Sequence, residues 1–127
     1  MKEIKVLIKR WNDDTMKYET VEELLKVGDG VTLNYYSDEE PATIIEIGRN
    51  GSFLVVQEDE AKRIDNNGMS DCQSYEYSRN EKGRIHTFYK TRRKDKTFYT
   101  DTGRSTYNEY GVYLTLKRRR KYFDYSF

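Results

Sequence analysis

Residues 42–57 contain the strongest hairpin signal in the chain, and this signal restricts the possible folds more than any other feature. Two apolar segments, residues 42–47 and 53–57, flank the sequence Gly48-Arg49-Asn50-Gly51. Asn-Gly is the dipeptide that most favours a tight turn between antiparallel strands, because both of its residues accept a positive φ. An antiparallel β-sheet is therefore predicted around this turn.

Apolar residues at every second position recur along the rest of the chain. In residues 4–9, Ile4, Val6 and Ile8 occupy alternate positions, as on a strand with one apolar face. A strand, a loop, a strand and a tight hairpin in succession are typical of SH3-like barrels, although open sheets share this series. Similar patterns predict further strands at residues 31–36, 73–78, 84–91, 96–100 and 112–117.

Residues 20–27 carry a different pattern. Thr20 and Glu23 have the spacing of a capping box, and Gly28 can take the left-handed conformation that ends a helix. The expected fold class is mainly β with one short helix, namely a small antiparallel SH3-like barrel or curled sheet preceded by an N-terminal strand and helix. A chain of 127 residues suits one domain, with residues 1–27 as the extension and residues 28–127 as the barrel or sheet.

Residue types that catalytic and metal sites need are scarce. The chain has one cysteine, Cys72, and one histidine, His86, which leaves no internal disulfide and little for a soft-metal site. A loop thiol and a surface histidine are a simpler interpretation than a Cys–His catalytic pair, and no common hydrolase, nucleotide-loop or zinc motif is present. We expect a protein without catalysis, cofactor or metal. No apolar run reaches the roughly 18 residues of a membrane span, which favours a cytoplasmic protein.

Charge is distributed unevenly between the two halves of the chain. Residues 1–60 contain seven Lys and Arg against fourteen Asp and Glu, whereas residues 61–127 contain sixteen against eight. Sixteen of the twenty-one Val, Ile and Leu residues lie in the first half, while nine of the twelve Tyr and four of the five Phe lie in the second. The first half is therefore predicted to supply most of an aliphatic core, and the second a basic, aromatic surface.

Candidate ligand-binding residues lie in the second-half strands and loops and in the C-terminal basic run. Guanidinium groups bind phosphate oxygens in pairs and aromatic rings stack on bases, so segments that alternate the two suit a nucleotide or a single strand. A strand through residues 118–120 would place Arg118 and Arg120 on one face and Arg119 on the other. The predicted ligand-binding residues are Arg84, His86, Tyr89, Arg92, Arg93, Lys96, Phe98, Arg104, Arg118 and Arg120.

Simpler interpretations compete with this site. Alternating polar residues also describe a solvated sheet face, and edge strands use Lys and Arg against aggregation. The arginines at 118–120 would equally serve as salt-bridge partners of the acidic first half. The turn-rich residues 64–71 suit either a ligand loop or a wide connection. The acidic clusters at 38–40 and 58–60 suit solvated loops better than a cation site.

Residues 27–127 carry several motifs that occur together in one family. They include Val27-Gly28-Asp29-Gly30-Val31-Thr32, Asp65-Asn66-Asn67-Gly68-Met69-Ser70, Tyr75-Glu76-Tyr77 and Tyr122-Phe123-Asp124-Tyr125-Ser126-Phe127. On these motifs the chain resembles a family of small proteins found in phages, prophages and other mobile elements of bacteria. The resemblance implies an accessory protein that acts by binding, for example by sequestering a nucleotide signal of a host defence system. It assigns no site residue.

Two functions fit these observations. One is a non-catalytic protein that binds or sequesters a phosphate-bearing nucleotide, such as a cyclic nucleotide signal, and thereby acts in counter-defence. The other is an SH3-like interaction module that binds and blocks a host protein or nucleic acid, where the uneven charge would steer two oppositely charged partners to different faces. The aromatic terminal residues 122–127 would be a liability if exposed, so we also expect a homodimer.

Overall fold

The computed structural model describes residues 3–35, 38–63, 75–105 and 111–118, and β-strands dominate these segments. The mainly-β fold class predicted from the sequence is confirmed. One 3-10 turn, η1 (Arg49–Gly51), accompanies the strands. The described strands are β1 (Glu3–Asn12), β2 (Lys17–Lys26), β3 (Gly30–Asn34), β4 (Glu39–Ile47), β5 (Phe53–Glu58), β6 (Glu60–Arg63), β7 (Tyr75–Ser78), β8 (Ile85–Lys90), β9 (Tyr99–Thr100) and β10 (Tyr113–Leu116).

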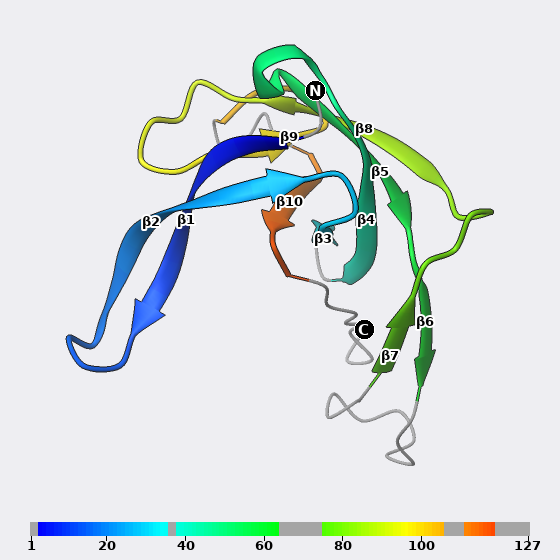
Figure 1. Ribbon diagram of the computed structural model, residues 1–127, viewed down its shortest axis with the longest axis horizontal. Helices are drawn as coiled ribbons and strands as arrows, with labels where there is room; N and C mark the ends of the chain where they lie inside the picture. The colour runs from blue at the N-terminus through cyan, green and yellow to red at the C-terminus, as the bar shows by residue number, and fades with distance from the viewer. Residues whose placement is uncertain (1–2, 36–37, 64–74, 106–110, 119–127) are drawn as a thin grey trace.

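Six strands close into a small antiparallel barrel in the order β10-β3-β4-β5-β8-β9 (Figure 1). The closure lies between β9 and β10, where Tyr113 pairs with Thr100. Beyond this pair, the Asp101 N–H donates to the Val112 carbonyl oxygen at 3.0 Å. Of the two architectures expected, a barrel or a curled sheet, the barrel is therefore the one that forms.

The predicted Asn-Gly hairpin joins β4 to β5. Asn50 has a φ of 56° and Gly51 a φ of 71°, as the sequence Asn-Gly allows. The Gly48 N–H closes the turn by donating to the Phe53 carbonyl oxygen at 2.8 Å. The register shifts by one residue between Ile44 and Glu46, and such a bulge bends β4 so that the sheet can curl into a barrel.

The barrel interior is filled by alternate side chains of its strands. Nine of the thirteen buried cluster residues lie in the first half of the chain, which confirms the predicted source of the aliphatic core. The second half adds two buried rings, Phe88 and Tyr99. The Tyr99 hydroxyl donates to the Gly51 carbonyl oxygen at 2.5 Å and so ties β9 to the β4–β5 hairpin.

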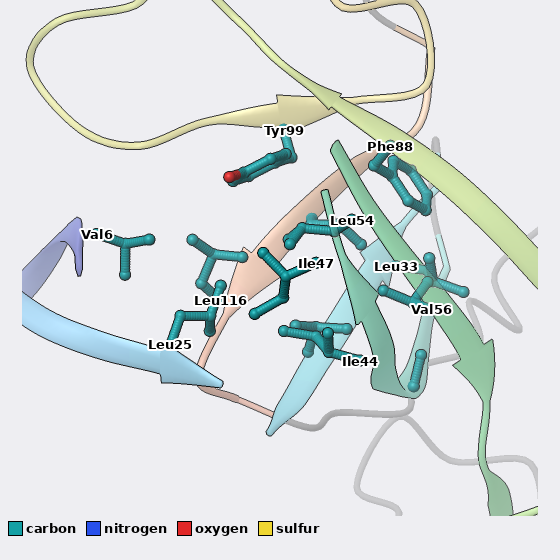
Figure 2. Packing of buried hydrophobic residues seen from close by; sticks show 13 residues of the cluster. Val6, Leu25, Leu33, Ile44, Ile47, Leu54, Val56, Phe88, Tyr99 and Leu116 are labelled. Atoms are coloured by element: carbon teal, nitrogen blue, oxygen red, sulfur yellow. The ribbon is translucent and has the colours of Figure 1, made fainter. Parts of the chain in front are cut away.

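Strands β1 and β2 form a long two-stranded ribbon, called the arm below, which projects from the barrel (Figure 1). Its base is part of the core, because Val6 and Leu25 are buried with the barrel residues Ile47 and Leu116 in one cluster (Figure 2). A second ribbon, β6–β7, extends from the opposite side of the barrel (Figure 1). The described segments contain no helix with the length and apolar content needed to span a membrane.

The short helix predicted at residues 20–27 is wrong, because most of this segment lies in β2. Val21 and Leu25 are four positions apart, a spacing that places two residues on one side of a helix and also on one face of a strand. Leu24 separates the two alternatives, since a helix would bury it, and it is 46% exposed. Pairing with β1 over ten positions outweighs the helical preference of a two-turn segment, which is unstable alone.

Candidate anion-binding groove

A groove of about 450 Å³ runs between the base of the arm, the loop that joins β8 to β9, and strand β10. It combines five basic residues with no acidic one. The arm contributes one wall and β10 the opposite wall. The lining residues are Leu7, Ile8, Lys9, Arg10, Lys96, Thr97, Phe98, Tyr113, Leu114, Thr115, Leu116, Lys117 and Arg118.

Backbone pairing holds the β8–β9 loop against the arm. The Thr97 N–H donates to the Leu7 carbonyl oxygen, and the Leu7 N–H donates to Thr97 Oγ1, both at 2.8 Å. The loop is closed at its base by the Thr91 N–H, which donates to the Phe98 carbonyl oxygen at 2.9 Å. These bonds align the end of the loop alongside β1 and fix the position of Lys96 at the groove.

Three cationic side chains gather around this loop. The Arg93 guanidinium lies 5.3 Å and the Lys96 ammonium 5.2 Å from the centre of the Phe98 ring, within the range of cation–π attraction. Burial is the main cause that lowers the pKa of Lys96, and the charge of Arg93 lowers it further. Asp95 opposes this shift and Lys9 adds to it. Lys96 is therefore half-buried beside two cationic neighbours, Arg93 and Lys9. A bound anion would stabilise its protonated form.

Asp95 is the acidic neighbour of this cluster, and its carboxylate is engaged by Arg93. The Arg93 Nε–H donates to Asp95 Oδ1 at 2.6 Å. This hydrogen bond is the main cause that lowers the pKa of Asp95. The Asp95–Arg93 pair leaves Lys9 and Lys96 without an ion pair to a described carboxylate.

At the other end of the groove, acidic residues engage some of the cations. Arg10 forms a salt bridge to Glu23 at 2.5 Å, and the Lys117 ammonium lies 3.0 Å from Asp29 Oδ2. The Arg118 carbonyl oxygen accepts a hydrogen bond from Thr32 Oγ1 at 2.6 Å, while its side chain is exposed. A second hollow of about 250 Å³, lined by Asp29, Gly30, Lys117 and Arg118, shares two residues with the groove. The basic surface thus continues past β10.

The structure brings together part of the predicted ligand-binding set. Lys96, Phe98 and Arg118 line the groove, and Arg93 contacts it through Phe98. Phe98 is only 5% exposed and packs 5.6 Å from Tyr113. Its ring therefore positions the cations and offers no face for stacking on a ligand.

The other predicted residues lie elsewhere. His86 pairs with Glu58, with 2.9 Å between Nε2 and Oε2, and Arg84 lies directly before the first residue of β8. Burial first, and then the charges of Glu58 and Glu40, raise the pKa of the nearby Tyr35, and the charge of Arg84 opposes this shift. Tyr89, Arg92 and Arg104 are exposed residues outside the groove, and Arg120 lies beyond the described residues, as do Cys72 and residues 64–71.

Sequence reasoning missed the contribution of the arm, above all Lys9 and Arg10. The first half has an excess of acidic residues, so its cations were not predicted as ligand contacts. The strand pattern around Ile8 indicated only a buried face. Their position beside Lys96 depends on the pairing of Leu7 with Thr97, two residues that are 90 positions apart. Local sequence patterns do not carry such a contact.

No group of three or more His, Cys, Asp or Glu side chains suited to a metal ion occurs in the described segments. Comparison of the chain with protein-family models, curated proteins and solved structures finds no match. The groove's own residues are therefore the basis for a functional proposal.

Proposed function

We propose that this protein is a non-catalytic binding protein that holds a phosphate-bearing ligand of the nucleotide type in the groove between the arm and β10. The observation that carries the proposal is the uncompensated charge of the groove. Lys9, Lys96 and Arg118 line it, and none of them makes an ion pair with a described carboxylate. A bound phosphate would supply the missing negative charge.

The groove offers two kinds of contact to such a ligand. Ammonium and guanidinium groups make charge-assisted hydrogen bonds to phosphate oxygens, and these bonds are stronger than neutral ones. The lining also includes Leu7 and the half-buried Tyr113, which provide apolar area for a sugar or a base. Binding of this kind requires no general base or nucleophile, and sequestration of a signal nucleotide needs only affinity.

The biological setting of this proposal comes from the resemblance to phage and mobile-element proteins. An accessory protein of such an element gains from removing a host signal, and capture in a basic groove achieves this without turnover. We therefore propose counter-defence by ligand capture in the host cytoplasm. The homodimer expected from the sequence stays a prediction, because the aromatic residues 122–127 on which it depends lie outside the described residues.

Isothermal titration calorimetry tests the proposal with inorganic phosphate, pyrophosphate, adenosine mono- and diphosphate, cyclic dinucleotides and cyclic ADP-ribose. The variant Lys96→Met keeps the length of the side chain and removes its charge. We expect it to lose about 10-fold or more of the affinity for the best ligand, since a hydrogen bond to a charged group contributes about 1.5–3 kcal/mol. The matched control is Lys82→Met in an exposed turn.

Two results would contradict the proposal. One is the absence of binding heat with every compound of the panel at ligand concentrations up to the millimolar range. The other is an affinity that Lys96→Met and Lys82→Met reduce equally, because the binding charge would then lie outside the groove. Circular dichroism of both variants verifies that the barrel is intact.

A further inference from the structure

The arm exposes an unusual amount of apolar surface. Among the described residues, nine large hydrophobic side chains are exposed, and six of them belong to the arm or directly follow it. Such a concentration of exposed apolar side chains in one ribbon makes the arm a candidate binding surface. The six are Leu7, Trp11, Met16, Tyr18, Leu24 and Val27.

Trp11 and Tyr18 form the centre of this surface. They are directly opposite each other in the β1–β2 register, and their ring centres are 5.1 Å apart with an angle of 70° between the planes. Trp11 is 48% and Tyr18 69% exposed. The Trp11 indole N–H donates to Asp13 Oδ1 at 2.8 Å. Because the indole N–H already has an acceptor, the exposed ring has no unsatisfied polar group.

The register of the arm places this ring pair on the same face as the groove cation Lys9, whereas Arg10 lies on the opposite face. Lys9 and Trp11 are two positions apart in β1, so their side chains lie on one face about 7 Å apart. Opposite Lys9 is Thr20, whose hydroxyl donates to the Asp95 carbonyl oxygen at 3.5 Å. The loop that carries Arg93 and Lys96 therefore lies on this face as well. Lys9, this loop and the ring pair therefore share one face of the arm.

We infer that Trp11 and Tyr18 form a base-stacking platform beside the groove, and that the ligand is a short single-stranded oligonucleotide. A phosphate occupies the site at Lys9 and Lys96, and the adjoining base stacks on the ring pair. Proteins that bind single strands combine basic grooves with exposed aromatic rings in this way. The inference rests on the proposed function, because it requires the groove to hold a phosphate.

The charges around the platform limit the length of the strand. Asp13 and Asp14 occupy the turn beyond Trp11 and repel further phosphates on that side. The formal net charge of the whole chain is only +1, whereas proteins that bind long nucleic acids carry a clear excess of positive charge. A ligand of a few nucleotides satisfies both conditions.

Trp11 is the only tryptophan of the chain, so its fluorescence reports directly on the platform. We propose titrations with thymidine monophosphate and with oligo(dT) and oligo(rU) of two, four and six nucleotides, followed by Trp11 fluorescence. The expected result is quenching together with an affinity that rises with length and then levels off. The DNA and RNA series separate the two sources of a single strand.

The variants Trp11→Leu and Tyr18→Leu keep apolar area on the ribbon and remove a ring. Because stacking on one ring contributes about 1–3 kcal/mol, each is expected to weaken oligonucleotide binding about 5- to 150-fold. Binding of thymidine monophosphate or pyrophosphate, measured by calorimetry, should change less than about twofold. Tyr89→Leu is the matched control, since Tyr89 is 47% exposed but lies on β8, outside the groove.

The outcomes separate this inference from the proposal on which it rests. If the oligonucleotides bind no more tightly than thymidine monophosphate, or if Trp11→Leu leaves their affinity unchanged, the platform is refuted and the groove proposal stands. The exposed arm would then serve a protein partner. If wild-type protein binds neither oligonucleotides nor any mononucleotide, both proposals fail. Thermal unfolding of each variant identifies a loss that comes from misfolding.

Discussion

At the scale of single residues, aromatic side chains of the second half take different roles that composition does not distinguish. Phe88, Phe98 and Tyr99 are buried, whereas Tyr89 is exposed. The enrichment of rings that suggested a stacking surface is therefore partly an enrichment of core. The rings best placed for stacking, Trp11 and Tyr18, come from the acidic half, in which no local pattern indicated a stacking surface.

Tyr99 supports a prediction about stability. Its hydroxyl, buried with the ring, donates to the Gly51 carbonyl oxygen. Tyr99→Phe leaves this carbonyl without its partner in the interior, so we expect the free energy of unfolding to fall by about 1–3 kcal/mol. Urea unfolding followed by circular dichroism measures the change. Tyr89→Phe, which removes an exposed hydroxyl, should stay within about 0.5 kcal/mol of wild type, and equal effects of the two variants would refute the assignment.

The same hydroxyl makes stability depend on alkaline pH. Burial raises the pKa of Tyr99 from 10.0 to about 12. The folded protein then keeps this proton at a pH where the unfolded chain has lost it. The contribution of the protonated Tyr99 to the free energy of unfolding is complete below pH 10 and is lost as the pH rises toward 12. Wild type should therefore lose unfolding free energy more steeply than Tyr99→Phe over this window, and parallel curves would contradict the burial of the phenol.

At the scale of elements, β2 is the case in which sequence and structure disagree. Thr20, Glu23 and Gly28 form a valid local helix signal, but that signal competes with a ten-residue partner strand. Strand pairing is a property of two segments, whereas capping is a property of one. The hairpin at Asn50-Gly51 was predictable because its turn chemistry and its flanking strands lie in one continuous segment.

Adjacent leucines distinguish a strand from a helix at this position. Leu25 is fully buried, and Leu24 is 46% exposed on the opposite face. Leu25→Ala should lower the free energy of unfolding by about 2–5 kcal/mol, because it leaves a cavity at the base of the arm. Leu24→Ala should cost less than about 1 kcal/mol. Urea unfolding of both variants provides the comparison, and similar large losses would favour the helix that the sequence suggested.

At the scale of the whole molecule, the antiparallel β fold was predictable, its closure was one of two expected alternatives, and the groove was predictable only in part. Alternating apolar residues and turn signals indicate each barrel strand separately, but they fit a curled sheet as well as a closed barrel, which leaves no exposed sheet edge. The groove instead depends on the position at which the arm packs against the barrel. That position is set by the pairing of Leu7 with Thr97 and by the salt bridge of Lys117 with Asp29, both of which join the two halves of the chain.

The charge distribution of the whole molecule leads to a prediction about salt. Because the net charge is +1, attraction to a nucleic acid strand has to come from the local cations of the groove. Lys9, Lys96 and Arg118 make no ion pair with a carboxylate of the described segments. Three such cations predict that the logarithm of the association constant falls with the logarithm of salt concentration with a slope of about −2 for a single strand. Lys96→Met should reduce the steepness by about 0.7, while Lys82→Met should leave it unchanged.

Fluorescence anisotropy of a labelled four-nucleotide strand measures this slope over about 50 to about 200 mM salt. A slope near zero in wild type would mean that phosphate contacts contribute little, and the groove would lose its role. A slope steeper than about −4 would require more cations than the groove supplies, which places the strand on a larger basic surface. Only a shallow slope that Lys96→Met reduces fits a short strand held by the groove cations.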